Sequence, residues 1–269
     1  MPVGLLRLID DYMDAVPRSE ARAEDIGQLR LFVRESRGWP YYARPIPGRR
    51  APVTVADLEA VRRRQRELGL PEAFEWVEEC APEMAAAADE AGLEVVLHPL
   101  LVLERLRSMP ARDGFRLVRV EADEGQIASC VAVAEVAFAS PGTQTGEAGV
   151  EAAEEALGRV DGDLIHAIHE RIREGLMVLW AVVARDGATV ATGGHQPVVE
   201  ATEIVGVATL PAFRRRGLGT AVTAALAADA REGGCRLVFL SAGDEATARV
   251  YEHAGFRRVG TTGAAERAG

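Results

Sequence analysis

Residues 214–220 combine three arginines with two glycines, a pattern suited to binding a phosphate-bearing ligand. The segment follows a β-rich stretch that stops at Pro211, and it precedes an alanine-rich helix predicted over 218–232. Glycine lets a backbone approach a bulky anion because it has no Cβ. The free N–H groups of the helix start and the helix dipole favour a diphosphate there, and the arginines can pair with further oxygens.

Two common nucleotide-binding motifs do not fit these residues. A P-loop ends in Gly-Lys-Ser/Thr, whereas the chain has no lysine and its 31 basic residues are all arginine. A Rossmann fingerprint would need glycine at position 222, where Val222 stands, and a tighter turn after the strand. A different phosphate-binding fold is therefore expected.

A second segment supports one such fold. In residues 244–256, the acidic residue Asp244 stands seven positions before Tyr251, and the segment ends with Gly255-Phe256. Residues 207–219 resemble, without a gap, the acetyl-CoA-binding core of the GNAT superfamily of acetyl-CoA-dependent N-acyltransferases. Residues 244–256 are similar to the other signature of that superfamily, in which asparagine usually stands at the place of Asp244.

The resemblance implies a role for each matched residue. The backbone of residues 207–209 would pair with the pantetheine arm, and residues 215–220 would cradle the pyrophosphate. Tyr251 would be the acid that protonates the departing thiolate. Asp244 departs from the pattern, and capping its helix is the role we expect for it. The predicted cofactor contacts are Val207, Ala208, Thr209, Arg214, Arg215, Arg216, Gly217, Leu218, Gly219 and Thr220.

Acetyl transfer to an amine also needs a base, because alkyl amines are mostly protonated at neutral pH. Glu203 is the leading candidate, since it lies at the start of the strand that enters the motif, as in the histone-acetylating branch of the superfamily. His195 and Glu200 are the reserves. The branch that acetylates ribosomal-protein N-termini carries a glutamate on the following strand, where this chain has Phe239.

Metal chemistry and disulfides are not expected. His166, His169 and Glu170 share a predicted helix, but they match no zinc-protease motif and no third ligand is apparent. The three cysteines are far apart and form no C-x-x-C pair, which favours buried thiols over a disulfide framework or a zinc site. Acetyl-CoA is the expected co-substrate, without a metal.

The composition excludes several partners. A net charge of −10 argues against nucleic acid, which rewards clustered positive charge. No apolar run approaches the ~20 residues that span a bilayer, and two aspartates interrupt the N-terminus before a signal-peptide core could form. A cytoplasmic protein with a small-molecule or peptide amine as acceptor is expected.

The periodicity of the second half predicts a mixed α/β sheet. Strands are expected at 115–120, 176–184, from 189, 203–210, 236–241 and 256–260, and helices at 126–138, 163–173, 218–232 and 244–254. Strands that alternate with helices in this way, together with the resemblance, predict a GNAT-like, mostly antiparallel twisted sheet flanked by helices.

The first half has fewer predicted elements and resembles a degenerate copy of the second. We expect a helix from Thr54 to Glu67, a strand at 74–77, a helix at 82–91 and a strand at 94–103. Sliding the chain along itself until Val55 falls on Leu218 overlays these elements on the later ones, with Ala88 on Tyr251. We call this alignment the internal overlay.

These observations predict two domains and a function. The chain is expected to hold a truncated, non-catalytic GNAT-like domain at 1–108 and a catalytic domain at 115–266. An N-acetyltransferase of primary amines, with direct attack on acetyl-CoA, is the leading function. An acyl-CoA-binding regulatory module without turnover is the alternative.

Overall fold

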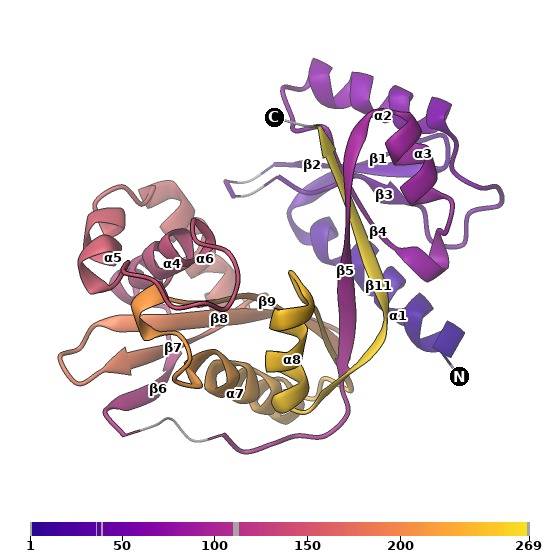
Figure 1. Cartoon of the computed structure of the whole chain (residues 1–269). Helices are drawn as coiled ribbons and strands as arrows, with labels where there is room; N and C mark the ends of the chain where they lie inside the picture. Colours follow the sequence, from indigo (N-terminus) through magenta and orange to yellow (C-terminus); the bar gives the residue numbers. More distant parts are fainter. Residues whose placement is uncertain (1, 36, 39, 110–112, 268–269) are drawn as a thin grey trace. The chain divides into compact units, whose positions relative to one another are not determined.

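A computed structural model describes residues 2–35, 37–38, 40–109 and 113–267 of the chain. It divides into two compact units, one formed by Met1–Leu100 with Val259–Gly269 and the other by Leu101–Arg258. Figure 1 shows the elements of both units. The last strand therefore begins in the second unit and ends in the first. The domain boundaries predicted from the sequence instead place all residues up to 266 in the second domain.

The second unit is a mixed α/β structure, as the periodicity predicts. Its elements are β6 (Phe115–Val120), α4 (Glu124–Phe138), α5 (Val150–Leu157), α6 (Gly162–Arg173), β7 (Val178–Ala184), β8 (Thr189–Val198), β9 (Ala201–Thr209), η3 (Pro211–Phe213), α7 (Leu218–Glu232), β10 (Leu237–Ser241), α8 (Glu245–His253) and the start of β11 (Phe256–Arg267). The predicted strands and helices are confirmed to within a few residues, except that β11 is longer. The short helix α5 has no counterpart in the sequence analysis.

The strands of the second unit follow the order β10-β9-β8-β7-β6, with the end of β5 (Leu93–Leu103) beside β10. Neighbours from β6 to β9 are antiparallel, and β9 and β10 are parallel. Figure 1 shows α4, α5 and α6 over one face of this sheet and α7 over the other. The predicted GNAT-like sheet with flanking helices is confirmed.

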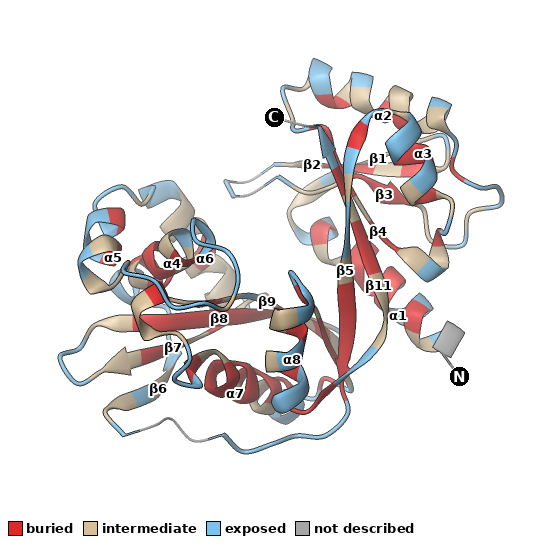
Figure 2. Ribbon diagram, in the orientation of Figure 1, coloured by how far each residue is buried: buried red, intermediate tan, exposed pale blue. Residues whose placement is uncertain are grey.

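Apolar residues of β8 and α7 form the centre of the second unit. Val190, Val222, Leu226 and Ala227 are fully buried, and both elements are largely red in Figure 2. Small residues on α7 let the helix lie close to the strands, and a Cβ on Gly193 would meet Val222 and Leu226 at about 3.0 Å. The alanine-rich sequence of α7 therefore serves close packing, which fixes the start of the helix against the sheet.

The first unit has more elements than the sequence predicted. It contains α1 (Pro2–Ala15), η1 (Val16–Ser19), β1 (Ala21–Ile26), β2 (Leu29–Arg34), β3 (Arg44–Pro45), α2 (Val55–Glu67), β4 (Ala73–Val77), η2 (Glu78–Cys80), α3 (Met84–Glu90), most of β5 and the end of β11. One sheet has the order β1-β2-β3, and the other strands follow the order β4-β11-β5. The antiparallel pairing of β4 with residues 262–266 makes the C-terminal segment part of this unit.

The two units share an order of elements. The internal overlay places Val55, the first residue of α2, on Leu218, the first residue of α7, and it places Leu93 of β5 on Phe256 of β11. The parallel bridge between Ala43 and Phe74 lies in the first unit where the parallel pairing of β9 with β10 lies in the second. The structural frame is thus repeated, as the internal overlay predicts.

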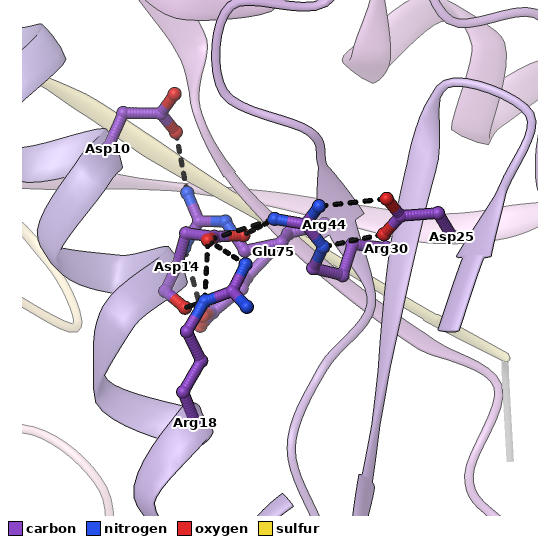
Figure 3. Close-up of polar contacts among 7 residues, drawn as sticks. All are labelled: Asp10, Asp14, Arg18, Asp25, Arg30, Arg44 and Glu75. Atoms are coloured by element: carbon purple, nitrogen blue, oxygen red, sulfur yellow. Dashed lines mark hydrogen bonds and ion pairs between the residues drawn. The ribbon is translucent and has the colours of Figure 1, made fainter. Parts of the chain in front are cut away.

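A network of arginines and aspartates holds α1 to the strands of the first unit (Figure 3). Arg44 on β3 is fully buried and donates to Asp10 of α1 at 2.5 Å, and its other terminal nitrogen lies 3.7 Å from Glu75 on β4. Burial raises the pKa of both the Asp10 and the Glu75 carboxyls. Removing one partner of such a buried pair strongly destabilises a fold, so this network makes α1 an integral part of the unit.

Cys80, Cys130 and Cys235 are free thiols; Cys130 and Cys235 are buried, as predicted, whereas Cys80 is only partly buried. Burial raises the pKa of Cys130 to about 11, which makes it unreactive. Within the part of the chain that the structure describes, no helix has the length and apolar character required to cross a lipid bilayer.

Candidate functional site

The strands β9 and β10 separate beyond a short stretch of pairing. Their parallel register joins Ala201–Thr202–Glu203 to Leu237–Val238–Phe239. Gly206, three residues further along β9, has a left-handed backbone with φ of +64°, and the β8–β9 register shifts opposite it. Such a bulge bends the strand locally. The later part of β9 therefore turns away from β10 and forms one wall of a pocket.

That pocket has a volume of about 690 Å³ and lies within the second unit. It is lined by the end of α4 with the loop after it, by β9 from Glu203 onward, by the turn into α7, and by the end of β10 with one face of α8. Every predicted cofactor contact lines it except Arg216. The lining residues among them are Val207, Ala208, Thr209, Arg214, Arg215, Gly217, Leu218, Gly219 and Thr220.

The start of α7 offers its backbone N–H groups to this pocket. The N-cap residue, Gly217, is left-handed with φ of +75°, and the described residues supply no side-chain cap and no acidic residue in the first turn. Arg215, also lining the pocket, has φ of +62°, which costs a residue with a side chain about 1–2 kcal/mol. Left-handed residues occur in the backbone nests that bind anions. The turn is built to receive negative charge.

The side chains of Arg214 and Arg216 are engaged with the protein. Arg214 donates to the backbone carbonyls of Thr209, Gln144, Ala137 and Ser140, at 2.6–3.2 Å. It therefore ties the turn before α7 to the loop after α4. The Arg216 guanidinium lies over the ring of Phe213, 5.1 Å from its centroid, outside the pocket lining. Arg216 was predicted to be a cofactor contact, but it does not line the pocket.

Tyr251 and Asp244 lie at the α8 wall of the pocket. Tyr251 is buried, and this burial, reinforced by the charge of Asp244, raises the pKa of its phenol to about 12. The phenol is therefore neutral at pH 7 and keeps a proton to donate. Asp244 caps α8 by accepting from the Thr247 backbone N–H at 2.6 Å, which confirms the capping role expected from its departure from the signature.

The three predicted bases lie in different places. Glu203 lines the pocket, at the last paired position of β9 before the strands separate. Glu200 lies in the turn before β9, and its carboxylate is 3.4 Å from Arg236 on the surface. His195 is buried on β8 and does not line the pocket. The structure therefore brings Glu203 and Tyr251 to one pocket and leaves both reserves outside it.

His195 belongs to a polar network beneath the sheet. Its Nδ1 lies 3.0 Å from the Thr202 hydroxyl and its Nε2 lies 3.3 Å from Asp229 on α7. Burial opposes ionisation of Asp229, but hydrogen bonds from His195 and Arg119 outweigh this and lower its pKa to about 2. Because both ring nitrogens have partners, His195 serves to connect β8, β9 and α7.

One wall of the pocket was not predicted from the sequence. Ala137, Phe138, Pro141, Gly142 and Thr143 line it, from the end of α4 and the loop that follows. The Phe138 side chain is exposed despite its size. The Ser-Pro-Gly sequence after Ala139 marks only the end of a helix, but an exposed aromatic at that position is a signal that points to a binding surface.

The sequence of the second unit matches a known family. Residues 147–256 match the Acetyltransferase (GNAT) family, from just before α5 to the first residue of β11. The second unit therefore contains a GNAT-family acetyltransferase domain. No curated protein sequence matches the chain.

Solved structures resemble the chain over its whole length, beyond the GNAT domain. A GCN5-related N-acetyltransferase from Kribbella flavida is 22% identical with a TM-score of 0.73, covering 98% of this chain and 96% of that one. A putative GNAT-family acetyltransferase from Novosphingobium aromaticivorans is 18% identical with a TM-score of 0.57, covering 98% and 97%. A tandem GNAT protein from the clavulanic acid biosynthesis pathway is 18% identical with a TM-score of 0.53, covering 90% and 79%. At these identities the likeness concerns the fold, and it includes the first unit.

Proposed function

We propose that the chain is an N-acetyltransferase, which moves the acetyl group of acetyl-CoA to a primary amine by direct attack. The observation that carries this proposal is the pocket that joins three features: the separated strand β9, the uncapped start of α7, and Tyr251 on α8. Acetyl-CoA is a thioester with a long pantetheine arm and a diphosphate. The arm can pair with a strand edge, and the diphosphate can bind at the helix N-terminus that follows it.

The residues of the pocket fit acetyl-CoA along its length. The backbone of residues 207–209 would pair with the pantetheine arm, and residues 215–220 would receive the diphosphate. A left-handed glycine at the helix start supports this fit, because a side chain at Gly217 would strain the turn that receives the anion. Arg214 would hold the loop through carbonyl groups rather than bind phosphate. When bound, the co-substrate supplies the activated acetyl group, and the reaction takes no metal.

Glu203 would act as the base. A carboxylate at the point where the strands separate can accept a proton from the ammonium of an acceptor, directly or through water, and leave a nucleophilic amine. Backbone N–H groups around residues 207–209 would stabilise negative charge on the acetyl oxygen. The base thus serves the acceptor side of the reaction.

Tyr251 would act as the acid. Its phenol keeps its proton at neutral pH because burial raises its pKa to about 12, and it lies in the same pocket. A phenol in this position can protonate the departing thiolate. A free thiol has a pKa of about 8.5 and leaves tolerably without help, so this contribution is smaller than that of the base.

The first unit would be a truncated GNAT-like domain without catalysis. The internal overlay places Ala88, a buried alanine of α3, where the second unit has Tyr251. The turn before α2 has Ala51-Pro52-Val53 where the second unit has arginines. This unit therefore lacks both the acid and the phosphate turn.

An amine panel tests the function. Purified protein is mixed with acetyl-CoA and separate acceptors: a peptide with a free N-terminus, a lysine peptide, a polyamine and an aminoglycoside. Released thiol and product mass are followed. The chain has no lysine, so its own side chains give no acetyl-lysine background. At least one acceptor should gain an acetyl group. Acetyl-CoA that binds without transfer to any amine would instead support the regulatory binding module.

A further inference from the structure

Two histidines of α6 lie beside the face of the helix that packs on the core. The apolar residues Leu164, Ile165, Ile168 and Ile172 contact the core beneath α4 and β7. His166 and His169 each follow one of these residues in sequence, so they lie at the edge of the packed stripe, about 100° further around the helix. Their rings are stacked, with centroids 6.2 Å apart.

Packing of α6 against α4 brings a carboxylate to these rings. Glu124 opens α4, and its Oε1 lies 3.9 Å from Nδ1 of His166. One ligand atom from each of Glu124, His166 and His169 lies within 4.8 Å of the other two. No metal was expected from the sequence, because no third ligand was apparent near the two histidines. The fold provides that ligand from a different helix.

A fourth residue orients one of the rings. Nδ1 of His169 lies 3.0 Å from the carboxylate of Glu170. A metal-binding histidine commonly donates one ring N–H to a carboxylate, which leaves its other nitrogen with a lone pair for the metal. With Nδ1 held by Glu170, Nε2 of His169 is the nitrogen that can bind.

We propose that Glu124, His166 and His169 bind one divalent transition-metal ion of the Zn²⁺ type, with water in the remaining positions. Two imidazoles and one carboxylate suit Zn²⁺, Co²⁺ or Ni²⁺ and disfavour Mg²⁺ and Ca²⁺, which prefer oxygen ligands. Zinc–nitrogen bonds of about 2.0–2.1 Å require neighbouring ligand atoms roughly 3.3 Å apart. The Glu124 and His166 side chains are 63% and 68% exposed, so they can rotate by the small amount needed.

The position of this site makes its role structural. Glu124 is the first residue of α4, whereas Ala137 and Phe138 at the other end of the same helix line the pocket. A helix of this length separates its ends by about 20 Å. A metal at Glu124 is too far away to polarise an acetyl group in the pocket. It would instead join α4 to α6 and stabilise the packing of the two helices.

Cobalt provides the test. Full-length protein without an affinity tag is treated with a chelator, desalted and titrated with Co²⁺ alone, while visible absorption is recorded and Zn²⁺ is added as a competitor. We expect saturation at one Co²⁺ per chain and displacement by Zn²⁺. His166→Ala and Glu124→Gln should weaken Co²⁺ binding by about tenfold or more. Glu170→Gln should also weaken it, because it removes the carboxylate that orients the His169 ring. Zn²⁺ should raise the Tm of the wild type and of neither ligand variant.

His253→Ala is the matched control, because His253 is an exposed histidine of α8 outside the group. It should bind Co²⁺ as the wild type does. Equal Co²⁺ affinity in His166→Ala and the wild type would overturn the proposal, as would a titration that does not saturate. The ligands are on the surface, so these variants should fold, and an unchanged far-UV circular dichroism spectrum checks that they do.

Discussion

The turns that lead into α2 and α7 are equivalent in the repeated frame and opposite in chemistry. At α2, Thr54 and Asp57 form a capping box, and the Glu83 carboxylate accepts the Val53 N–H at 2.9 Å and pairs with Arg49. At α7, Gly217 caps the helix without a side chain, and none of the described residues of its first turn is acidic. In the first unit, the protein's own carboxylates satisfy the helix start. In the second unit, no described side chain caps the helix start, and we propose that the diphosphate binds there.

A repeated frame can therefore keep a pocket while the chemistry of the adjacent helix start changes. A cavity of about 770 Å³ remains beside the turn before α2, lined by Arg49 and Glu83 among others. Its helix N-terminus already has negative charge, which would repel a diphosphate. The internal overlay places Asp57 on Thr220, so one position accounts for much of the contrast.

The largest expected effect comes from a side chain at the α7 turn. Gly217→Val should weaken acetyl-CoA binding by about 10²-fold or more, because a branched residue strains the left-handed turn and its Cβ occupies the place of the diphosphate. Calorimetry measures the affinity.

Gly48→Val is the matched control for this change. Gly48 lies in the corresponding region of the first unit with φ of +69°, so the substitution imposes a similar backbone strain. Acetyl-CoA affinity should remain that of the wild type. A loss in both variants would mean that global destabilisation, rather than the phosphate turn, explains the effect.

The next effect concerns catalysis. Glu203→Gln should keep acetyl-CoA affinity and lower kcat/KM for the amine by about 10²-fold, as typical for loss of a general base. Higher pH should restore part of the rate, because more of the amine is then neutral. Steady-state kinetics across pH measure this.

Tyr251→Phe provides the contrast to Glu203→Gln. It removes only the proton donor on the thiolate side, so a smaller loss of about tenfold is expected, without the same recovery at high pH. Full activity of Glu203→Gln at pH 7 would show that Glu203 is not the base.

A smaller change should convert the open turn into the closed one. Thr220→Asp introduces at the third position of α7 the acid that α2 has at Asp57. We expect acetyl-CoA affinity to fall by about tenfold, since the carboxylate competes with the diphosphate for the helix N–H groups. Thr220→Asn, similar in size but neutral, should retain most of the affinity. Equal losses in the two variants would attribute the effect to packing at this buried position.

Sequence alone located those pocket residues that have local signals. The glycines of the α7 turn, Asp244 and Tyr251 lie in two short segments that resemble the GNAT signatures, and their expected roles come from that resemblance. The wall from Phe138 was missed because it depends on how α4 packs, and Arg214 ties it to the site only through backbone carbonyls. His195 was a reserve base because the sequence does not indicate which face of β8 it lies on.

The fold, too, was predicted only where the sequence has a local signal. Strands and helices with clear periodicity, such as β6 and α7, were predicted, whereas the eight-residue helix α5 and the elements before Val55 were not. The latter depend on tertiary contacts such as the burial of Arg44 against Asp10. The pairing of the end of β11 with β4 in the first unit also has no local signal in the sequence. Strands that are distant in sequence are brought together by the topology of the fold.

A separate prediction concerns protein stability at the far end of α7, where the internal overlay pairs the half-buried Asp229 with Arg66, which is exposed on α2. The folded-state pKa of Asp229 is lowered from 3.8 to about 2. Its stabilisation of about 2 kcal/mol is therefore complete above the unfolded-state pKa and is lost as pH falls through the folded-state value. Chemical denaturation as a function of pH should show this loss in the wild type and not in Asp229→Asn. Asp186→Asn in the exposed β7–β8 turn should follow the wild type, and a wild-type pH profile for Asp229→Asn would contradict the assignment.

The number of acetyl-CoA molecules bound per chain tests the central claim most directly. The claim is that the helix start of the second unit accepts the diphosphate and that of the first unit does not. Calorimetric titration of the full chain should give one site. Two sites would show that the carboxylates around α2 do not exclude the ligand. A single site that survives in Gly217→Val would place acetyl-CoA outside the α7 turn, and either result would contradict the account.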